Sequence, residues 1–133
     1  SVVSILYGIH LFKPKGLKNI ILMGIGNNGS FNLDYIPRRL KIISSVLGKD
    51  IHSDFDFKNG KYKMIHHNLN GTGYCTYSDI MPYDYHGLIF HPRYEGKCMN
   101  YIQENKDKFK KYWTQNTLFW VVGNKPISTF LFS

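Results

Sequence analysis

The most constraining feature of the sequence is the dipeptide Asn59-Gly60, which lies between the stretches Ser53–Lys58 and Lys61–His67. Both stretches alternate apolar and polar residues, as half-buried strands do. Asn-Gly supplies the two positive φ angles of a type I′ turn, which joins antiparallel strands through a two-residue loop. Counting outward from the turn, Phe57 would face Tyr62 across the pair. The sequence therefore predicts a β-hairpin here.

The other periodic stretches extend this prediction to the whole chain. Further strands are expected at Val2–Phe12, Leu17–Met23, Tyr74–Ser78, Tyr85–His91, Tyr94–Cys98, Leu118–Val122 and Ile127–Phe132. Apolar residues at helical spacing predict one helix from Asp34, its cap, to Leu47, and another from about Met99 to Trp113. Pro37 is expected in the first turn of the earlier helix. The approximate order ββαββββ(β)αββ predicts an α+β fold, a mostly antiparallel β-sheet with two main helices packed against it.

Length and composition favour one compact basic domain over residues 1–133. A chain of 133 residues can bury a core of its own but is short for two domains. It contains no apolar run of the roughly 18 residues that would span a bilayer, so we expect a soluble, intracellular protein. Cys75 and Cys98 are too few for a disulfide scaffold, and we expect both to be buried free thiols.

A formal net charge of +8 indicates a polyanionic partner. We interpret the chain as a nucleic-acid-contacting module, with RNA favoured over DNA. Basic side chains on the two predicted helices would contact phosphates, and tyrosines beside lysines would stack on bases. The candidate contacts are Arg38, Arg39, Lys41, Lys106, Lys108, Lys110, Lys111, Tyr62 and Tyr112.

A different class of function also fits the charge. Lysine greatly outnumbers arginine and the chain has no alanine, as expected from a genome rich in A and T. The basicity could then reflect composition, and the chain would be a non-catalytic structural or protein-interaction subunit. A toxin-like RNase domain released from a larger protein is a third alternative. Binding that weakens steeply with salt would favour nucleic acid over an apolar protein partner.

Asp84, Glu95 and Lys97 are the first candidates for catalysis. If Tyr94–Cys98 is a strand, Glu95 and Lys97 point to the same side of it. The group resembles the PD-(D/E)xK nuclease arrangement, in which two carboxylates bind a divalent metal and a lysine activates the attacking water. The resemblance implies a metal-dependent phosphodiesterase with Asp84 and Glu95 as ligands of Mg²⁺ or Mn²⁺.

His67 and His86 form the alternative catalytic pair. Histidines that end one strand and flank the next resemble the order found in HNH and related ββα-metal nucleases. Without a metal, the two histidines and Lys97 could act as acid, base and oxyanion partner in RNA cleavage. The sequence leaves both assignments open.

The pattern Gly24-x-Gly26-x-x-Gly29 lies between a predicted strand and a predicted helix. This is the local context of a dinucleotide or phosphate cradle. Such a cradle belongs to a parallel β-α-β unit, and here the next strand is expected in the antiparallel Asn-Gly hairpin. We therefore interpret the glycines as a connection.

Overall fold

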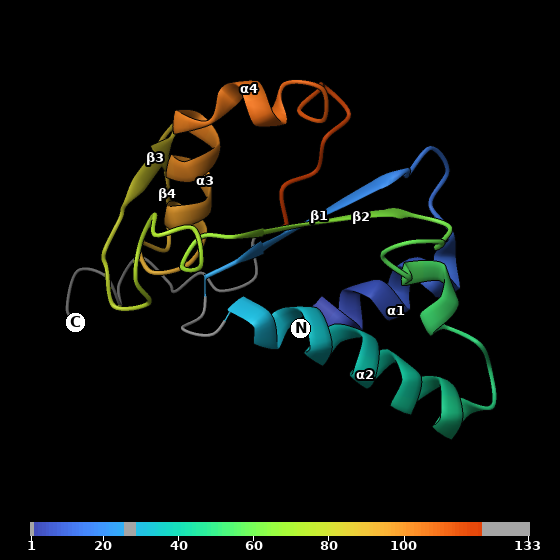
Figure 1. Cartoon of the computed structure of the whole chain (residues 1–133). Coiled ribbons are helices and arrows are strands. Elements are labelled where there is room, and N and C mark those ends of the chain that lie inside the picture. Colours follow the sequence, from blue (N-terminus) through green and yellow to red (C-terminus); the bar gives the residue numbers. More distant parts are fainter. Residues whose placement is uncertain (1, 26–28, 121–133) are drawn as a thin grey trace. The chain divides into compact units, whose positions relative to one another are not determined.

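The computed structural model describes residues 2–25 and 29–120, whose contacts divide into two compact units (Figure 1). Of the described residues, the first unit contains 2–24 and 29–68, and the second contains Ile25 and 69–120. Each unit is described by itself, and the expectation of a single domain stays a prediction. Among the described residues, no helix has both the length and the apolar character needed to cross a membrane.

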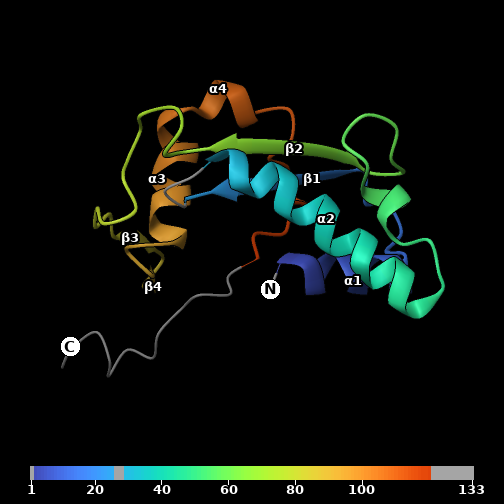
Figure 2. The same ribbon diagram turned by 60° about the horizontal axis from the view of Figure 1, so that its bottom comes forward.

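The first unit is built around a pair of parallel strands. Its elements are the helices α1 (Val2–Phe12) and α2 (Gly29–Leu47), the 3₁₀ helix η1 (His52–Phe55), and the strands β1 (Asn19–Gly24) and β2 (Lys63–Asn68). β1 and β2 run parallel, in register from Asn19 opposite Lys63 to Gly24 opposite Asn68. Figures 1 and 2 show α1 and α2 on the same side of this pair. The chain therefore passes from β1 through α2 to β2 as a β-α-β unit.

The core of the first unit explains why Val2–Phe12 is a helix and not the predicted strand. Val3, Leu6 and Tyr7 follow helical spacing, and Leu6 is buried against Leu40 of α2 and the other members of one apolar cluster. At the other end of α1, His10 Nδ1 lies 2.8 Å from Asp54 Oδ2 of η1. Burial against α2 thus outweighs the strand preference of the valines and isoleucines.

The prediction of α2 is confirmed in its body and wrong at its start. Ile36 and Leu40 are buried on one stripe of the helix, as its spacing predicts. The helix begins at Gly29, so Asp34 is not its cap and Pro37 lies inside it. Leu47, expected on the buried stripe, is 45% exposed.

The predicted Asn59-Gly60 hairpin is wrong. Asp56 Oδ1 accepts hydrogen bonds from the backbone N–H groups of Lys58 and Asn59, which closes a local turn in place of a strand ladder. Gly60 is needed for close approach, because a Cβ there would lie 2.5 Å from Asp56 O. Instead of pairing with Ser53–Lys58, the second predicted strand pairs with β1 as β2.

The second unit contains the one antiparallel pair of the described residues. β3 (Tyr83–Tyr85) pairs with β4 (Leu88–Phe90), and α3 (Glu95–Glu104) and α4 (Lys106–Phe109) follow. His86 and Gly87 between the strands have φ angles of 51° and 86°, so the two-residue turn with positive φ occurs here. Asp84 Oδ1 accepts a hydrogen bond from Gly87 N at 2.8 Å and supports this turn.

Other predictions for the second unit are corrected by its helices. Tyr94–Cys98 is not a strand, because Glu95 to Cys98 form the first turn of α3. The predicted helix Met99–Trp113 starts earlier and is interrupted at Asn105, whose Nδ2 donates to Tyr101 O at 2.8 Å. Tyr74–Ser78 and residues 118–120 form no strand, and residues 121–133, with most of the last two predicted strands, lie outside the described residues.

The fold class is thus α+β as expected, but the mostly antiparallel sheet is wrong. In the described residues the strands form two separate pairs, one parallel and one antiparallel. Both cysteines are buried and free, as predicted.

Candidate phosphate-binding site

The parallel pairing brings two strand ends and one helix start to the same edge of the first unit. Gly24 ends β1 and lies opposite Asn68, which ends β2. α2 starts at Gly29, five residues after the end of β1. In a parallel β-α-β unit, ligands bind at the carboxyl ends of the strands, where the first helix presents its amino end. The sequence interpretation of Gly24-x-Gly26-x-x-Gly29 as a connection rested on an antiparallel neighbour, and that premise is wrong.

His66 lies at this edge, on the face of the strand pair that carries the helices. It follows Met64 of the core by two residues and lies opposite Leu22, which packs on the same core. Its Nε2 is buried and has no hydrogen-bond partner within the described part of the chain. Burial, and to a lesser extent the neighbouring His67, lowers the pKa of His66. The lowered pKa favours the neutral ring of His66 at pH 7.

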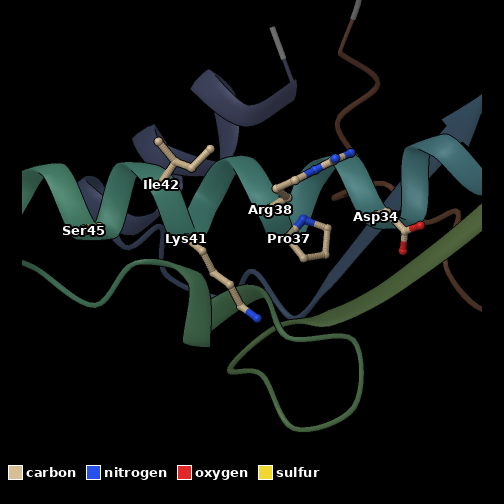
Figure 3. A pocket seen from close by; sticks show the side chains of 6 residues that line it. All are labelled: Asp34, Pro37, Arg38, Lys41, Ile42 and Ser45. Atoms are coloured by element: carbon tan, nitrogen blue, oxygen red, sulfur yellow. The ribbon is translucent and has the colours of Figure 1, made fainter.

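The exposed face of α2 carries three of the cations of this unit, Arg38, Arg39 and Lys41. Arg38 and Lys41 line an open groove of about 680 Å³ together with Asp34 and Ser45. Figure 3 shows Arg38 reaching along the helix toward Asp34, that is, toward the amino end of α2, while Lys41 points away from the helix. Arg38 thus adds a cation on the side of the helix start, where an anion is favoured.

The three residues of the predicted PD-(D/E)xK arrangement do not share a strand. Asp84 is on β3 with Oδ1 bonded to Gly87, whereas Glu95 and Lys97 are buried in α3. Two residues apart on a helix, Glu95 and Lys97 do not face the same way. Among the described residues, no three His, Cys, Asp or Glu side chains are grouped to hold a metal. The predicted Mg²⁺ or Mn²⁺ site of Asp84 and Glu95 is therefore wrong.

Lys97 is held in a structural role. It is 0% exposed, and its Nζ donates to Thr76 O at 2.8 Å and to Tyr77 O at 2.7 Å. The ammonium also lies 5.7 Å from the centre of the Tyr77 ring. These contacts pin the turn at 76–77 to α3.

The structure places the alternative histidines in different units. His67 is in β2 beside His66, and His86 is at the exposed turn between β3 and β4. His67 is among the candidates predicted from sequence, His66 is predicted only as its neighbour in the histidine pair that ends the strand, and Asn68 is not predicted as a site residue. The signal that could have found them is the run of polar residues His66-His67-Asn68, which follows the apolar pair Met64-Ile65 at the end of the strand.

The predicted nucleic-acid contacts are mostly exposed. The exposed ones are Arg38, Arg39 and Lys41 on α2, Lys106 and Lys108 on α4, and Lys110 and Lys111 after it. Tyr62 is 2% exposed and stacks on Phe55 with ring centres 5.4 Å apart, so its predicted stacking on bases is wrong. Tyr112 is half-buried under Lys111, whose Nζ lies 5.0 Å from its ring.

Comparison with known proteins points to a different class of function. A curated protein of Salmonella phage ViI, named O-seryl-dTMP PLP-dependent decarboxylase, is 32% identical to this chain over 165 aligned residues. The alignment includes 95% of this chain and 38% of the relative, so the chain spans well under half of the relative's length. The aligned length also exceeds the 133 residues of this chain, so the relative carries additional residues within the aligned stretch. No protein-family model and no solved structure matches the chain.

This similarity overturns the functional interpretation drawn from charge. Nearly the whole chain aligns with a protein named as a decarboxylase, so a nuclease, a toxin-like RNase and an RNA-binding module are wrong interpretations. The divalent-metal cofactor is wrong as well, since the relative's name gives PLP (pyridoxal phosphate). The expectation of a nucleic-acid or protein partner is not tested by these observations and stays a prediction.

Proposed function

We propose that this chain works as part of a PLP-dependent enzyme that decarboxylates an amino acid carried on a nucleotide, and that its first unit binds a phosphate group in that enzyme. The similarity to the phage protein along 95% of the chain supports the class of reaction. The observation that carries the binding role is the parallel β1-α2-β2 unit with a glycine-rich connection after β1. The chain aligns with 38% of the relative's length, so we assign to it only a part of that activity.

The amino end of α2 and the glycines before it support phosphate binding. The first N–H groups of a helix have no partner within the helix, and its dipole places about half a positive charge at that end. Glycines allow the backbone to come close to phosphate oxygens. α2 has 19 residues and starts at Gly29, the last glycine of the pattern, so its amino end is suited to a dianion.

Two phosphate monoesters are implied by the relative's name: PLP and the dTMP part of its substrate. Both carry the same terminal phosphate, so the chemistry at the edge of β1 and β2 is common to them. The neutral His66 ring, with its buried Nε2, adds one group that can accept or donate a hydrogen bond to such a ligand.

The described residues fit the phosphate of PLP but do not complete a PLP site. An enzyme of this class needs a lysine amine facing the aldehyde of the cofactor. Lys97 is the one buried lysine of the described chain, and its amine is occupied by two carbonyl groups. The other described lysines are exposed. We therefore assign to this chain the binding of the phosphate group, and not the lysine that bonds to the aldehyde of PLP.

Calorimetric titration of the full chain with matched ligands tests this proposal. We expect PLP, dTMP and inorganic phosphate to compete for one site. PLP and dTMP should bind at least about tenfold more tightly than pyridoxal and thymidine, which lack the phosphate. A tenfold ratio in affinity equals about 1.4 kcal/mol. Equal binding with and without the phosphate would contradict the proposal.

A pair of glycine substitutions gives the matched control. Gly26→Val changes the second glycine of the pattern, which in such motifs lets the backbone approach the phosphate, and should abolish the preference for phosphate-bearing ligands. Gly8→Val in α1, where a Cβ meets nothing within 4 Å, should leave binding unchanged.

A further inference from the structure

The second unit contains an aromatic groove that the proposed phosphate site does not use. Its volume is about 520 Å³, within the range of about 300–1,000 Å³ typical of small-molecule sites. Tyr85, Phe90, Trp113 and Phe119 provide its aromatic walls, and Gln115 is among its polar residues. None of the residues that line it is charged. The groove therefore suits the neutral, flat part of a ligand.

The aromatic rings are arranged as a platform. Phe90 is 5% exposed, and the ring of Tyr85 lies nearly parallel to it, with an interplanar angle of 10° and centres 6.4 Å apart. Phe119 lies 5.7 Å from Phe90 and 6.2 Å from Trp113, measured between ring centres. Tyr85 and Trp113 remain 50% and 42% exposed. Aromatic surface that is both ordered by neighbours and open to solvent is suited to stacking with a planar ring.

The polar side of the groove is a rigid turn that carries one available amide. Thr117 Oγ1 donates to Tyr112 O at 2.7 Å and accepts from Thr114 N at 2.8 Å, so this hydroxyl is used to close the turn. Gln115 lies between the two threonines, and no hydrogen bond occupies its side-chain amide within the described part of the chain. An amide offers a donor and an acceptor side by side.

We propose that this groove binds a uracil-type pyrimidine ring, such as thymine, stacked on the aromatic walls. The Gln115 amide oxygen accepts from the ring N3–H, and its NH₂ group donates to an adjacent ring carbonyl. The choice of this ring over other planar rings rests on the proposed function, because the relative's name gives dTMP as the nucleotide part of its substrate. The groove itself, with its stacked rings and free amide, is observed in the second unit alone.

Fluorescence of Trp113 provides a test without phosphate or catalysis. The chain has two tryptophans, so Trp120→Phe leaves Trp113 as the reporter. In the full chain with this substitution, thymidine should quench the fluorescence saturably. N3-methylthymidine, which lacks the N3–H donor and offers no acceptor in its place, should bind about tenfold more weakly, as expected for one two-point contact. Absence of saturable quenching by thymidine, or equal affinity for both nucleosides, would overturn the proposal.

Substitution of the amide separates recognition from nonspecific stacking. Gln115→Leu should weaken thymidine binding about tenfold and remove the preference over N3-methylthymidine. Asn116→Leu, next to it on the same turn but not part of the groove, should leave both unchanged. A Gln115→Leu variant that still prefers thymidine would overturn the assignment. If PLP and dTMP bind through their phosphates while thymidine does not quench Trp113, the groove assignment fails and the proposed function stands.

Discussion

At the scale of single residues, Lys97 shows how a candidate catalytic group can be structural. Its buried ammonium satisfies two carbonyl groups of the turn at 76–77. From sequence alone, Glu95-x-Lys97 in a strand was a reasonable nuclease pattern, but its chemistry depended on the strand. Because these residues form the first turn of α3, the side chains diverge and the lysine is enclosed. The directions of these two side chains could not be predicted, because the segment was expected to be a strand and is a helix.

Substitution of Lys97 distinguishes a structural lysine from a cofactor lysine. Lys97→Met leaves Thr76 O and Tyr77 O without this donor, and we expect a loss of about 1–3 kcal/mol in the free energy of unfolding. PLP affinity of the full chain should not change. Urea denaturation and PLP titration measure the two effects, with the exposed Lys108→Met as control. Loss of PLP binding at unchanged stability would contradict the structural role.

His66 makes a second prediction, for pH dependence. Burial lowers the pKa of His66 in the folded chain below the ordinary histidine value of 6.5. The unfolded chain therefore binds a proton at a higher pH than the folded chain does. The stabilisation is fully present above the unfolded pKa and is lost as the pH falls through it toward the folded pKa.

Urea denaturation between pH 7.5 and pH 5.5, which extends about one unit to each side of the ordinary histidine pKa, measures this effect. The free energy of unfolding should fall on acidification, and His66→Gln should flatten the profile more than His86→Asn at the exposed β3–β4 turn. A profile that keeps its slope in His66→Gln would refute the assignment.

At the scale of elements, the sequence predicted where several elements lie better than how they pair. The positions of β1 and β2 and the buried stripe of α2 follow from their apolar patterns. The direction of pairing did not, because Asn59-Gly60 gave a local hairpin signal that Asp56 overrides with its own turn. That error hid the proposed phosphate-binding edge, since the glycine pattern indicates a phosphate site only in a parallel unit. α1 was missed because its packing on α2 is a long-range contact.

The end of α2 provides a prediction at this scale. Ser44 Oγ donates to Leu40 O at 2.8 Å and accepts from Ile51 N at 3.0 Å and His52 N at 3.2 Å. One buried hydroxyl thus joins the last turns of α2 to the start of η1. Ser44→Ala leaves the Ile51 and His52 N–H groups without this acceptor.

We expect Ser44→Ala to cost about 1–3 kcal/mol in the free energy of unfolding. Its exposed neighbour Ser45→Ala should stay within about 0.5 kcal/mol of the parent chain. Chemical denaturation compares the two variants. Equal stability of both would show that the Ser44 hydroxyl does not join the two helices.

At the scale of the whole molecule, net charge gave the least reliable guide to function. A charge of +8 suggested a polyanionic partner. The chain aligns instead with a protein whose name describes a decarboxylase of a nucleotide-linked amino acid. A polyanion and a ligand with a single phosphate group would both be attracted to a positively charged protein. What separates them is a shaped site, and the structure offers two candidates, the edge of β1 and β2 and the aromatic groove of the second unit.

The most direct test of the central claim is the mapping of a bound phosphate by amide and imidazole NMR shifts. Titration of the full chain with PLP, and separately with inorganic phosphate, should move the signals of the amides between Gly24 and the first turn of α2, and of the His66 ring. Both ligands should affect the same residues, and pyridoxal should not. Shifts confined to the exposed lysines of α4, or equal shifts with pyridoxal, would contradict phosphate binding at this edge.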